Sequence, residues 1–340
     1  MSLRMKHIAR RITHLDTAAL KETLTQCNQD SGKSKAALLA DMSRCALRYG
    51  AGYRDYSLFR FYALTPQQRA TYVTRGTNER LNAALNDKTA AKLFDDKAEF
   101  YARYFDLLRR RWLLLEGCTL SRFAMFAGGL DRIVLKPRNG SCGQGISQLR
   151  AEDFPSLSAL YDHVMESGAE LCEEAVVQHG DMERLFPGAV NTVRVGTLRC
   201  GDTVHLLYAY LRMGNSAAPV DNLNAGGLCA PVDVQTGTVT HPGCDKAHRV
   251  FIVHPKTGCP IPGFHIPMWA ETVYLCTAAA LRCEGMRYVG WDIAVTPEGP
   301  LIIEGNNLPG YDILQLPAHL PADKTGMLPR FRALLPELSL

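Results

Sequence analysis

The feature that most constrains the fold of this chain is a pair of apolar runs joined by a short turn. The sequence from Tyr288 to Gly310 reads YVGWDIAVTPEGPLIIEGNNLPG, in which apolar residues flank a Pro-Glu-Gly turn. This pattern is typical of a two-stranded antiparallel hairpin. Each run nevertheless contains one carboxylate, Asp292 in the first and Glu304 in the second. The hairpin therefore places two acids within a segment that is otherwise apolar.

The register of the hairpin decides whether these two acids meet. If the strands pair symmetrically about Glu298, Asp292 lies directly opposite Glu304, and their Cβ atoms are about 5 Å apart on one face. The same symmetry pairs residue 294 with residue 302. The side chains expected to point the other way, into a core, are Ile293, Val295, Leu301 and Ile303.

Two carboxylates at this distance repel each other by about 3 kcal/mol at an effective dielectric constant of 20. A sheet keeps such a pair if one acid is protonated or if a cation bridges them. Asn306 adds an amide oxygen two residues beyond Glu304, and ligands that are all oxygen favour Mg²⁺ over zinc. Alternatively, the acids face solvent, or arginines such as Arg194 and Arg212 neutralise them. The residues alone leave these interpretations open.

A second candidate feature is the glycine-rich segment IVLKPRNGSCGQGI, which begins at Ile133. A strand ending at Lys136 precedes a loop whose small residues leave room for backbone N–H groups to approach phosphate oxygens. The loop lacks both the lysine of a P-loop and the third glycine of a dinucleotide-binding motif. By itself it is also compatible with a plain flexible turn. Combined with the carboxylates, it predicts a site for a magnesium-bound nucleotide, because Mg²⁺ usually shares its ligands with phosphate oxygens.

The rest of the sequence divides into a helical part and a strand-rich part. Caps at Asp16, Thr65 and Asp87 precede helical periodicity, and one helical run is expected from Asp87 to residue 115. From residue 132 onward, strand-like segments predominate, with helices expected at 155–166 and 267–284. Helices segregated from antiparallel hairpins predict an α+β fold.

Composition excludes several classes of function. The 38 basic and 34 acidic residues give a net charge of +4, which does not indicate a nucleic-acid-binding surface. The 11 cysteines include no C-x-x-C pair and suit a reducing cytoplasm. No segment approaches about 18 uninterrupted apolar residues, so no transmembrane segment is expected. Oligomeric state is not indicated. We expect a cytoplasmic protein that acts on small molecules.

Taken together, these features resemble the ATP-grasp superfamily. The phrases VNTVRVGTL, VDNLNAGGL, PGFHIPMW and RYVGWDIAVTPEGPLIIEGN are similar to its sugar-transfer-associated branch. The resemblance covers most of the chain after residue 90 and implies an α+β ATP-grasp fold, in which two subdomains grip a nucleotide. It implies a helical N-terminal region over 1–90, a small subdomain with the glycine loop over 91–178, and a large subdomain with the magnesium site over 179–340.

The resemblance also implies roles for individual residues. Two lysines reach the nucleotide phosphates, the strand LCEEAVVQ faces adenine, and an acid beyond it binds the ribose. The implied magnesium ligands are Asp292, Glu304 and Asn306. The implied catalytic residues are Arg194, Arg212 and Lys136. The implied nucleotide-binding residues are Lys97, Lys136, Gly140, Ser141, Gly143, Gly145, Glu173, Glu174, Val176, Asp181, Asn222 and Asn224.

The activity implied by the resemblance is an ATP- and Mg²⁺-dependent ligase that joins a carboxylate to an amine or a thiol through an acyl phosphate. A sugar-linked acceptor and a role in polysaccharide biosynthesis follow from the association of this branch with sugar transfer. Two alternatives remain, a kinase that phosphorylates a hydroxyl and a non-catalytic nucleotide-binding partner in a glycan-biosynthesis complex. One departure is the helical character of residues 1–90, where ATP-grasp chains usually begin with an α/β domain.

Overall fold

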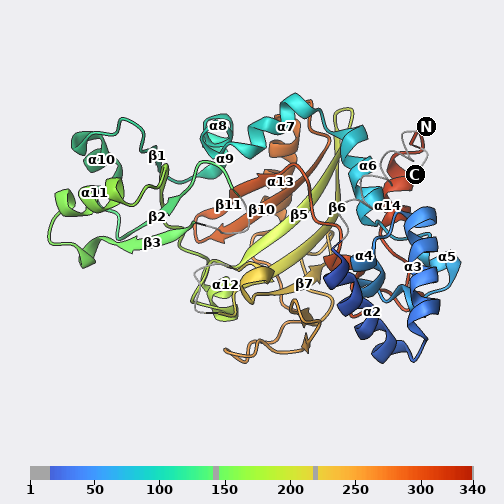
Figure 1. Ribbon diagram of the computed structural model, residues 1–340. Coiled ribbons are helices and arrows are strands. Elements are labelled where there is room, and N and C mark those ends of the chain that lie inside the picture. The colour runs from blue at the N-terminus through green and yellow to red at the C-terminus, as the bar shows by residue number, and fades with distance from the viewer. Residues whose placement is uncertain (1–15, 141–144, 217–220, 339–340) are drawn as a thin grey trace. The chain divides into compact units, whose positions relative to one another are not determined.

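The computed structural model describes residues 16–140, 145–216 and 221–338 (Figure 1). These residues form two compact units. The first, here called the helical unit, combines the chain up to Leu81 with Leu314–Leu340, and the second, here called the sheet unit, is Asn82–Ile313. The three-part division expected from the sequence, at residues 90 and 178, stays a prediction. None of the helices in the described ranges is both long enough and apolar enough to cross a membrane.

The helical unit is built from short capped helices. They are α2 (Thr17–Ser31), α3 (Lys35–Tyr49), α4 (Tyr53–Leu58), η1 (Phe61–Ala63), α5 (Pro66–Arg69) and α14 (Leu328–Leu334), while α6 (Arg75–Leu85) runs on into the sheet unit and η4 (Ile313–Gln315) runs back. Asp16 accepts hydrogen bonds from the first free N–H groups of α2, and Thr65 forms a capping box. Both caps were predicted from the sequence and are confirmed.

The C-terminal segment belongs to the helical unit through hydrogen bonds that no local pattern reveals. The side chain of Gln315 accepts a hydrogen bond from Val73 N at 2.8 Å and donates one to Val73 O at 2.8 Å. The backbone N–H of Leu328 donates to Thr71 O at 2.8 Å. Residues about 250 positions apart in the chain are therefore held in one core.

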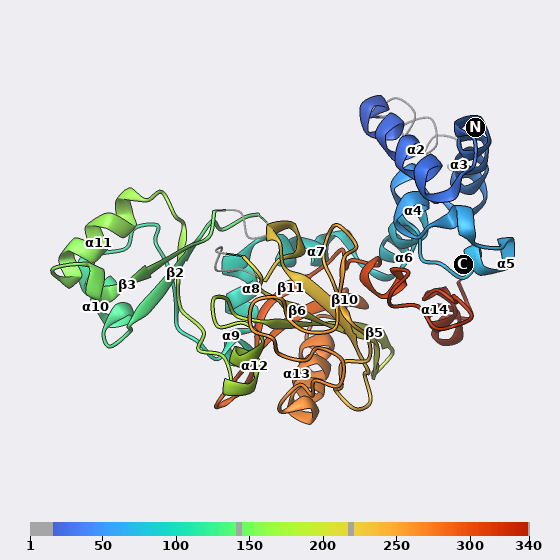
Figure 2. The same cartoon turned by 90° about the horizontal axis from the view of Figure 1, so that it is seen from below.

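The sheet unit contains a four-stranded antiparallel sheet in the order β1, β4, β2, β3. Its strands are β1 (Trp112–Leu114), β4 (Leu171–Glu174), β2 (Arg132–Lys136) and β3 (Ser147–Arg150). The helices α10 (Leu120–Ala127) and α11 (Leu157–Glu166) lie beside it (Figures 1 and 2). Apolar side chains of strands and helices share one core, which includes Leu113, Phe123, Ile133, Leu135 and Leu160. The glycine loop leaves this sheet at the end of β2.

A seven-stranded antiparallel sheet forms the larger part of the sheet unit, in the order β11, β10, β5, β6, β7, β8, β9. Its strands are β5 (Thr192–Cys200), β6 (Thr203–Met213), β7 (Leu228–Val232), β8 (Gly243–Cys244), β9 (Val250–Phe251), β10 (Tyr288–Thr296) and β11 (Gly299–Asn306). The helices around it are α7 (Lys88–Asp95), α8 (Lys97–Arg103), α9 (Phe105–Leu108), α12 (Gly180–Leu185) and α13 (Trp269–Leu281). The core beneath one face of the sheet includes Phe100, Val193, Leu275, Ile293 and Ile302. Helices α8 and α13 thus pack against the same apolar face.

The predicted helical run from Asp87 to residue 115 is confirmed as helical up to Leu108, but it is divided into α7, α8 and α9, and its end is wrong. It breaks at Asp96, whose carboxylate accepts hydrogen bonds from the backbone N–H groups of Ala98 and Glu99 and so begins a new helix, α8. The run ends in a strand, because β1 pairs with β4 at the edge of the smaller sheet. The tertiary pairing therefore overrides the helical propensity of this segment.

The hairpin of β10 and β11 pairs Asp292 with Glu304, as the sequence predicted. The pairing of residue 294 with residue 302 is wrong, because Ile302 pairs instead with Ile293. A β-bulge between Asp292 and Ile293 separates these two registers.

The physical reason for the shift is a tight turn. Thr296 pairs with Gly299, so only two residues connect the strands, and Gly299 has φ of 131°. This turn moves the register by one residue, and the bulge restores it before Glu304. As a consequence Ile302, and not Ile303, contributes to the core.

Candidate active site

A row of polar side chains crosses the seven-stranded sheet on the face opposite its apolar core. Glu304, Asp292, Arg194 and Tyr210 are direct neighbours on β11, β10, β5 and β6. Successive side chains of a strand point to opposite faces. Asp292, Arg194 and Tyr210 lie on this face because each is one position away from a core residue, as Asp292 is from Ile293, and the bulge keeps Glu304 opposite Asp292.

Asp292 is held by two arginines. Its Oδ2 accepts hydrogen bonds from Arg194 Nη2 at 2.8 Å and from Arg212 Nη1 at 2.7 Å, and its Oδ1 contacts Arg194 Nε. Burial raises the pKa of Asp292, but the two guanidinium groups outweigh it and lower this pKa to about 2. Arginine neutralisation, one of the interpretations left open by the sequence, therefore applies to this acid.

The network continues beyond Arg212 to a second buried acid. Arg212 Nη2 donates to Asp221 Oδ1 at 2.7 Å, and Asp221 Oδ2 accepts a hydrogen bond from the backbone N–H of Thr192 at 3.0 Å. Asp221 lies directly before Asn222, which caps the short helix η3 (Leu223–Ala225) by accepting from Asn224 N at 2.9 Å. The two asparagines expected near the phosphates are thus tied to the arginine network through Asp221.

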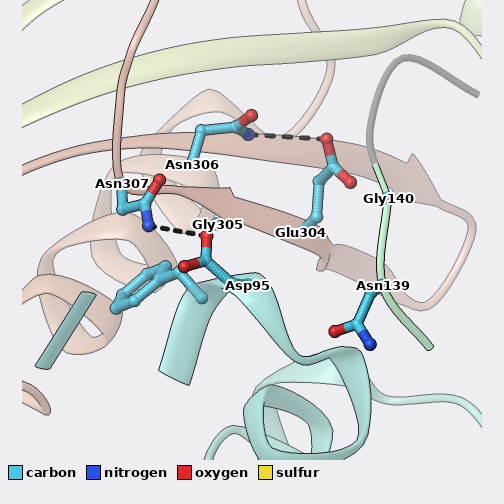
Figure 3. Close-up of a pocket in the computed structure, with 8 residues that line it drawn as sticks. Asp95, Asn139, Gly140, Glu304, Gly305, Asn306 and Asn307 are labelled. Atoms are coloured by element: carbon cyan, nitrogen blue, oxygen red, sulfur yellow. Dashed lines mark hydrogen bonds between the residues drawn. The ribbon is translucent and has the colours of Figure 1, made fainter. Parts of the chain in front are cut away.

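Glu304 has a different environment from Asp292. Within the ranges that the structure describes, no arginine or lysine forms an ion pair with Glu304. Its side chain contacts Asn306 Nδ2 at 3.5 Å (Figure 3) and the carboxyl group of Asp292. Burial raises the pKa of Glu304 and the nearby charge of Asp292 raises it further, while the charges of Arg194 and Arg212 oppose this shift without cancelling it. Glu304 is therefore a partly buried carboxyl group that has no ion pair among the described residues.

Glu304 lines a cavity of about 300 Å³, a size at the lower end of small-molecule sites. Figure 3 shows that its walls come from three segments, the end of α7, the start of the glycine loop and the end of β11. The lining residues are Phe94, Asp95, Asn139, Gly140, Glu304, Gly305, Asn306 and Asn307. The glycine loop and one of the two acids thus face the same space.

Lys97 lies at the start of α8 and holds the glycine loop at this cavity. Its Nζ donates to Gly140 O at 2.9 Å, and its backbone N–H donates to Arg138 O at 3.0 Å. Arg138 in turn forms an ion pair of 2.7 Å with Asp96. Burial lowers the pKa of Lys97, whereas the charge of Glu304 raises it. Lys97 is thus both a contact of the loop and a cation in the field of Glu304.

Lys136, at the end of β2, is buried with an ion-pair network of its own. Its Nζ contacts Glu173 on β4, and the same carboxylate accepts hydrogen bonds from Arg110 Nε at 2.7 Å and from the hydroxyl of Tyr101 at 3.1 Å. Burial lowers the pKa of Lys136 and Arg110 lowers it further, while Glu304 opposes both. Glu173 is thus shared between Arg110 and Lys136.

The remaining residues of the predicted nucleotide site lie elsewhere in the sheet unit. Glu174 accepts a hydrogen bond from the backbone of Arg111 at 3.0 Å, Val176 is partly buried after β4, and Asp181 is half exposed on α12. None of these three is among the described residues that line the cavity. Gly145 has φ of 70°, and the predicted residues Ser141 and Gly143 fall outside the described ranges.

Sequence reasoning missed several residues of this site. Asp95 and Asn139 line the cavity, while Arg110 and Asp221 orient charged groups around it. Two signals were present, since Asp95 is two residues from Lys97 and Asp221 stands within the phrase VDNLNAGGL. Arg110 gave no signal, because it sits in a run of three arginines that has the appearance of a solvated charge cluster.

Comparison with known families agrees with this geometry. A family model described as sugar-transfer associated ATP-grasp matches residues 76–333. The chain belongs to this family. Its fold class is therefore the α+β ATP-grasp fold, with a helical region at the N-terminus, as the sequence predicted. No curated protein matches the chain.

Several solved structures are similar to this ATP-grasp chain. D-cycloserine synthetase DcsG is 12% identical with a TM-score of 0.45, over 77% of this chain and 76% of that chain. ATP-grasp ligase PsnB, complexed with a minimal precursor, is 17% identical with a TM-score of 0.45, over 84% of this chain and 75% of that chain. D-alanine-D-alanine ligase from Helicobacter pylori is 14% identical with a TM-score of 0.42, over 77% and 68%.

The side chains at the cavity fit the divalent cation that an ATP-grasp fold implies. Glu304 and Asn306 offer oxygen atoms from one end of β11, and Glu304 lacks a positive partner among the described residues. Oxygen donors of this kind suit Mg²⁺. Asp292 contributes less, because its two oxygens already accept three hydrogen bonds out of about four lone-pair positions. Glu304 is thus the better placed of the two acids to bind a metal ion.

Proposed function

We propose that this chain is an ATP- and Mg²⁺-dependent ligase, which joins a carboxylate to an amine through an acyl phosphate and releases ADP and phosphate. The observation that carries the proposal is the position of Glu304. This partly buried carboxylate, which forms no ion pair among the described residues, faces the same cavity as Gly140 of the glycine loop, and its charge acts on both Lys97 and Lys136. Membership of the ATP-grasp family supports ATP as the nucleotide.

In this proposal the two lysines contact the phosphate oxygens of ATP. Mg²⁺, held by Glu304 and Asn306 with a share of Asp292, would neutralise phosphate charge. Lys97 also fixes the glycine loop through Gly140 O, so nucleotide binding and loop position are linked. The strand residues Glu173, Glu174 and Val176 with Asp181 stay proposed for the adenine and ribose side, and Asn222 and Asn224 for the phosphate side.

Arg194 and Arg212 are proposed to hold the transferring phosphoryl group and the substrate carboxylate. Asp292 fixes both guanidinium groups, and Asp221 fixes Arg212 from its other side. Among the described residues, Nη1 of Arg194 and Nε of Arg212 make no hydrogen bond. A guanidinium that is oriented at one edge and open at another is suited to anionic oxygens.

The chemistry proceeds in two displacements. A carboxylate oxygen of the first substrate forms a bond to the γ-phosphorus, and ADP leaves with the electrons of the broken P–O bond. The nitrogen of the neutral amine then forms a bond to the acyl carbon, the bond from that carbon to the phosphate oxygen breaks with its electrons going to the phosphate, and the nitrogen loses one proton. We further propose an acceptor linked to a sugar, a cytoplasmic location and a role in polysaccharide biosynthesis, which the association of the family with sugar transfer supports.

The experiment that tests this function is Glu304→Gln. The fold should persist, while Mg²⁺-dependent ADP release should fall at least about a hundredfold, as for other groups that stabilise charge in a transition state. ADP release is measured with panels of amino acids and uronic acids, with and without amines. Glu298→Gln is the matched control, because Glu298 is exposed in the turn of the same hairpin and should leave turnover unchanged.

Product analysis separates the alternatives. A ligase releases ADP and phosphate when both substrates are present, a kinase leaves phosphate on the acceptor, and a binding module releases neither. Near-normal turnover in Glu304→Gln would show that the metal assignment is wrong.

A further inference from the structure

The segment after β11 folds back over the polar face of the seven-stranded sheet. A methyl group at Gly290 of β10 would lie 3.2 Å from Pro309, so this proline packs directly on the strand. The hydroxyl of Tyr208 on β6 donates to Gly310 O at 3.1 Å. The segment is thus fixed above β10 and β6, next to Arg194 of the polar row.

This fold brings Asp312 close to Tyr210, the last member of the polar row. A methyl group at Gly310 would lie 3.5 Å from Asp312 Oδ1 and 3.9 Å from the hydroxyl oxygen of Tyr210. The distance between Asp312 Oδ1 and the hydroxyl oxygen of Tyr210 is therefore at most the sum of these two distances. Tyr210 is also the direct cross-strand neighbour of Arg194.

Both polar groups have hydrogen-bonding capacity that the described residues do not use. Tyr210 is only 6% exposed, yet within residues 16–140, 145–216 and 221–338 its hydroxyl makes no hydrogen bond. The carboxyl group of Asp312 accepts one hydrogen bond, from the adjacent backbone N–H of Ile313 at 3.1 Å. Its Oδ2 has no partner in the same ranges. Asp312 and the hydroxyl of Tyr210 thus have acceptor positions left over beside Gly310.

The charges around Asp312 indicate which chemical group would bind beside it. Asp312 is partly exposed, yet burial raises its pKa, while its own and the Ile313 backbone N–H groups, Arg194 and His248 lower it. The charge of Arg194 is already matched by Asp292. His248 is exposed, so solvent screens its charge. The carboxylate is therefore short of a close positive charge. An ammonium group supplies three N–H donors and that charge, whereas a hydroxyl supplies one donor and none.

We propose that Asp312 and Tyr210 bind the protonated amino group of the amine substrate. This inference rests on the proposed ligase function and assigns the subsite of its second substrate. The ammonium gives one proton to the carboxylate of Asp312. The nitrogen lone pair then forms the C–N bond, the bond from the acyl carbon to the phosphate oxygen breaks with its electrons going to the phosphate, and the second proton leaves with that phosphate.

Equilibrium binding to the full-length protein tests the subsite directly. The probes are ethanolamine and glucosamine, each compared with its hydroxyl counterpart, ethylene glycol and glucose, by ligand-observed NMR. The wild type should prefer each amine, and Asp312→Asn should weaken amine binding about tenfold without changing binding of the hydroxyl probes. Tyr210→Phe should weaken amine binding by a smaller factor. Asp202→Asn, at an exposed hairpin turn, is the matched control and should change nothing.

A second measurement keeps this inference separate from the proposed function. Hydroxylamine captures an acyl phosphate as a hydroxamate and carries no charge at neutral pH, so it does not need the ammonium subsite. Asp312→Asn should retain hydroxamate formation and ATP affinity while the KM for amines rises. Absence of hydroxamate in the wild type would contradict the ligase function. Amine binding that is unchanged in Asp312→Asn, or a wild type that does not prefer amines, would overturn the subsite alone.

Discussion

At the scale of single residues, Asp292 and Glu304 share a face but have opposite electrostatic needs. Asp292 balances the buried guanidinium groups of Arg194 and Arg212, so Asp292→Asn leaves positive charge buried without its partner. We expect it to lower the free energy of unfolding by about 3–5 kcal/mol. Glu304→Gln removes a charge that lacks compensation and should leave stability within about 1 kcal/mol or raise it. Urea denaturation followed by circular dichroism measures both, and equal losses in the two variants would contradict this assignment.

Lys136 provides a pH-dependent prediction. Burial, with Arg110, lowers its pKa to about 7, so at pH 8 most molecules of the nucleotide-free protein hold this lysine neutral. Phosphate oxygens favour the charged form and raise this pKa. ATP binding at pH 8 should therefore take up nearly one proton, whereas binding at pH 6 should take up little.

Isothermal titration calorimetry in two buffers with different ionisation enthalpies measures the proton uptake of Lys136. Lys136→Met, which keeps the length of the side chain and removes the titrating group, should abolish the difference between the buffers. A wild type that gives equal heats in both buffers at pH 8 would disprove the prediction.

The sequence predicted that the two acids share a face, because strand periodicity is local. It did not predict which acid the arginines would neutralise. That choice depends on the reach of two long side chains on β5 and β6, and both guanidinium groups end at Asp292. That Glu304 forms no ion pair among the described residues is thus a property of the packed sheet and not of either strand.

At the scale of elements, the bulge in β11 makes backbone carbonyl groups available to a side chain from another element. It frees backbone carbonyls of this strand, and Arg110 donates to Ile302 O at 2.6 Å and to Ile303 O at 3.2 Å. The same guanidinium group binds Glu173 on β4 of the smaller sheet. Arg110 therefore joins the two sheets of the unit at Glu173, the residue that Lys136 also contacts.

Two adjacent arginines allow a matched test of this junction. Arg110 has 3% of its side chain exposed, and Arg110→Met should lower the free energy of unfolding by about 3–5 kcal/mol because Glu173 and two carbonyls lose a partner. Arg111 has 43% of its side chain exposed and is 3.6 Å from Glu174, so Arg111→Met should cost less than about 1 kcal/mol. Chemical denaturation of both variants is the measurement. Losses of similar size would show that Arg110 does not hold the sheets together.

The sequence predicted the strands of the hairpin and the caps of the early helices, since both depend on neighbouring residues. It did not predict the bulge or the break at Asp96. The bulge follows from a turn one residue shorter than assumed, and the break follows from the ion pair of Asp96 with Arg138 as well as from its capping bonds. Contacts across the fold decide such details.

At the scale of the whole molecule, the sequence predicted a helical N-terminal region. It did not predict that the C-terminal segment belongs to the same unit as that region. The bonds of Gln315 to Val73 join positions that no periodic pattern connects. The two apolar cores of the sheet unit, in contrast, are composed of residues between Phe100 and Ile302. The sheet unit therefore has hydrophobic cores of its own, which an independently folding domain requires.

The last prediction follows from this division of the cores. A fragment of residues 82–313 should unfold cooperatively and bind ATP with an affinity within a few-fold of that of the intact chain, because the cavity, the lysines and the polar row all lie within it. Removing only residues 1–81 should give a poorly soluble protein, since Leu328 and Phe331, now 4% and 0% exposed, lose their core. Thermal unfolding and fluorescent-nucleotide binding compare the two fragments. A fragment 82–313 that is unfolded, or folded without nucleotide affinity, would show that the site depends on the helical unit.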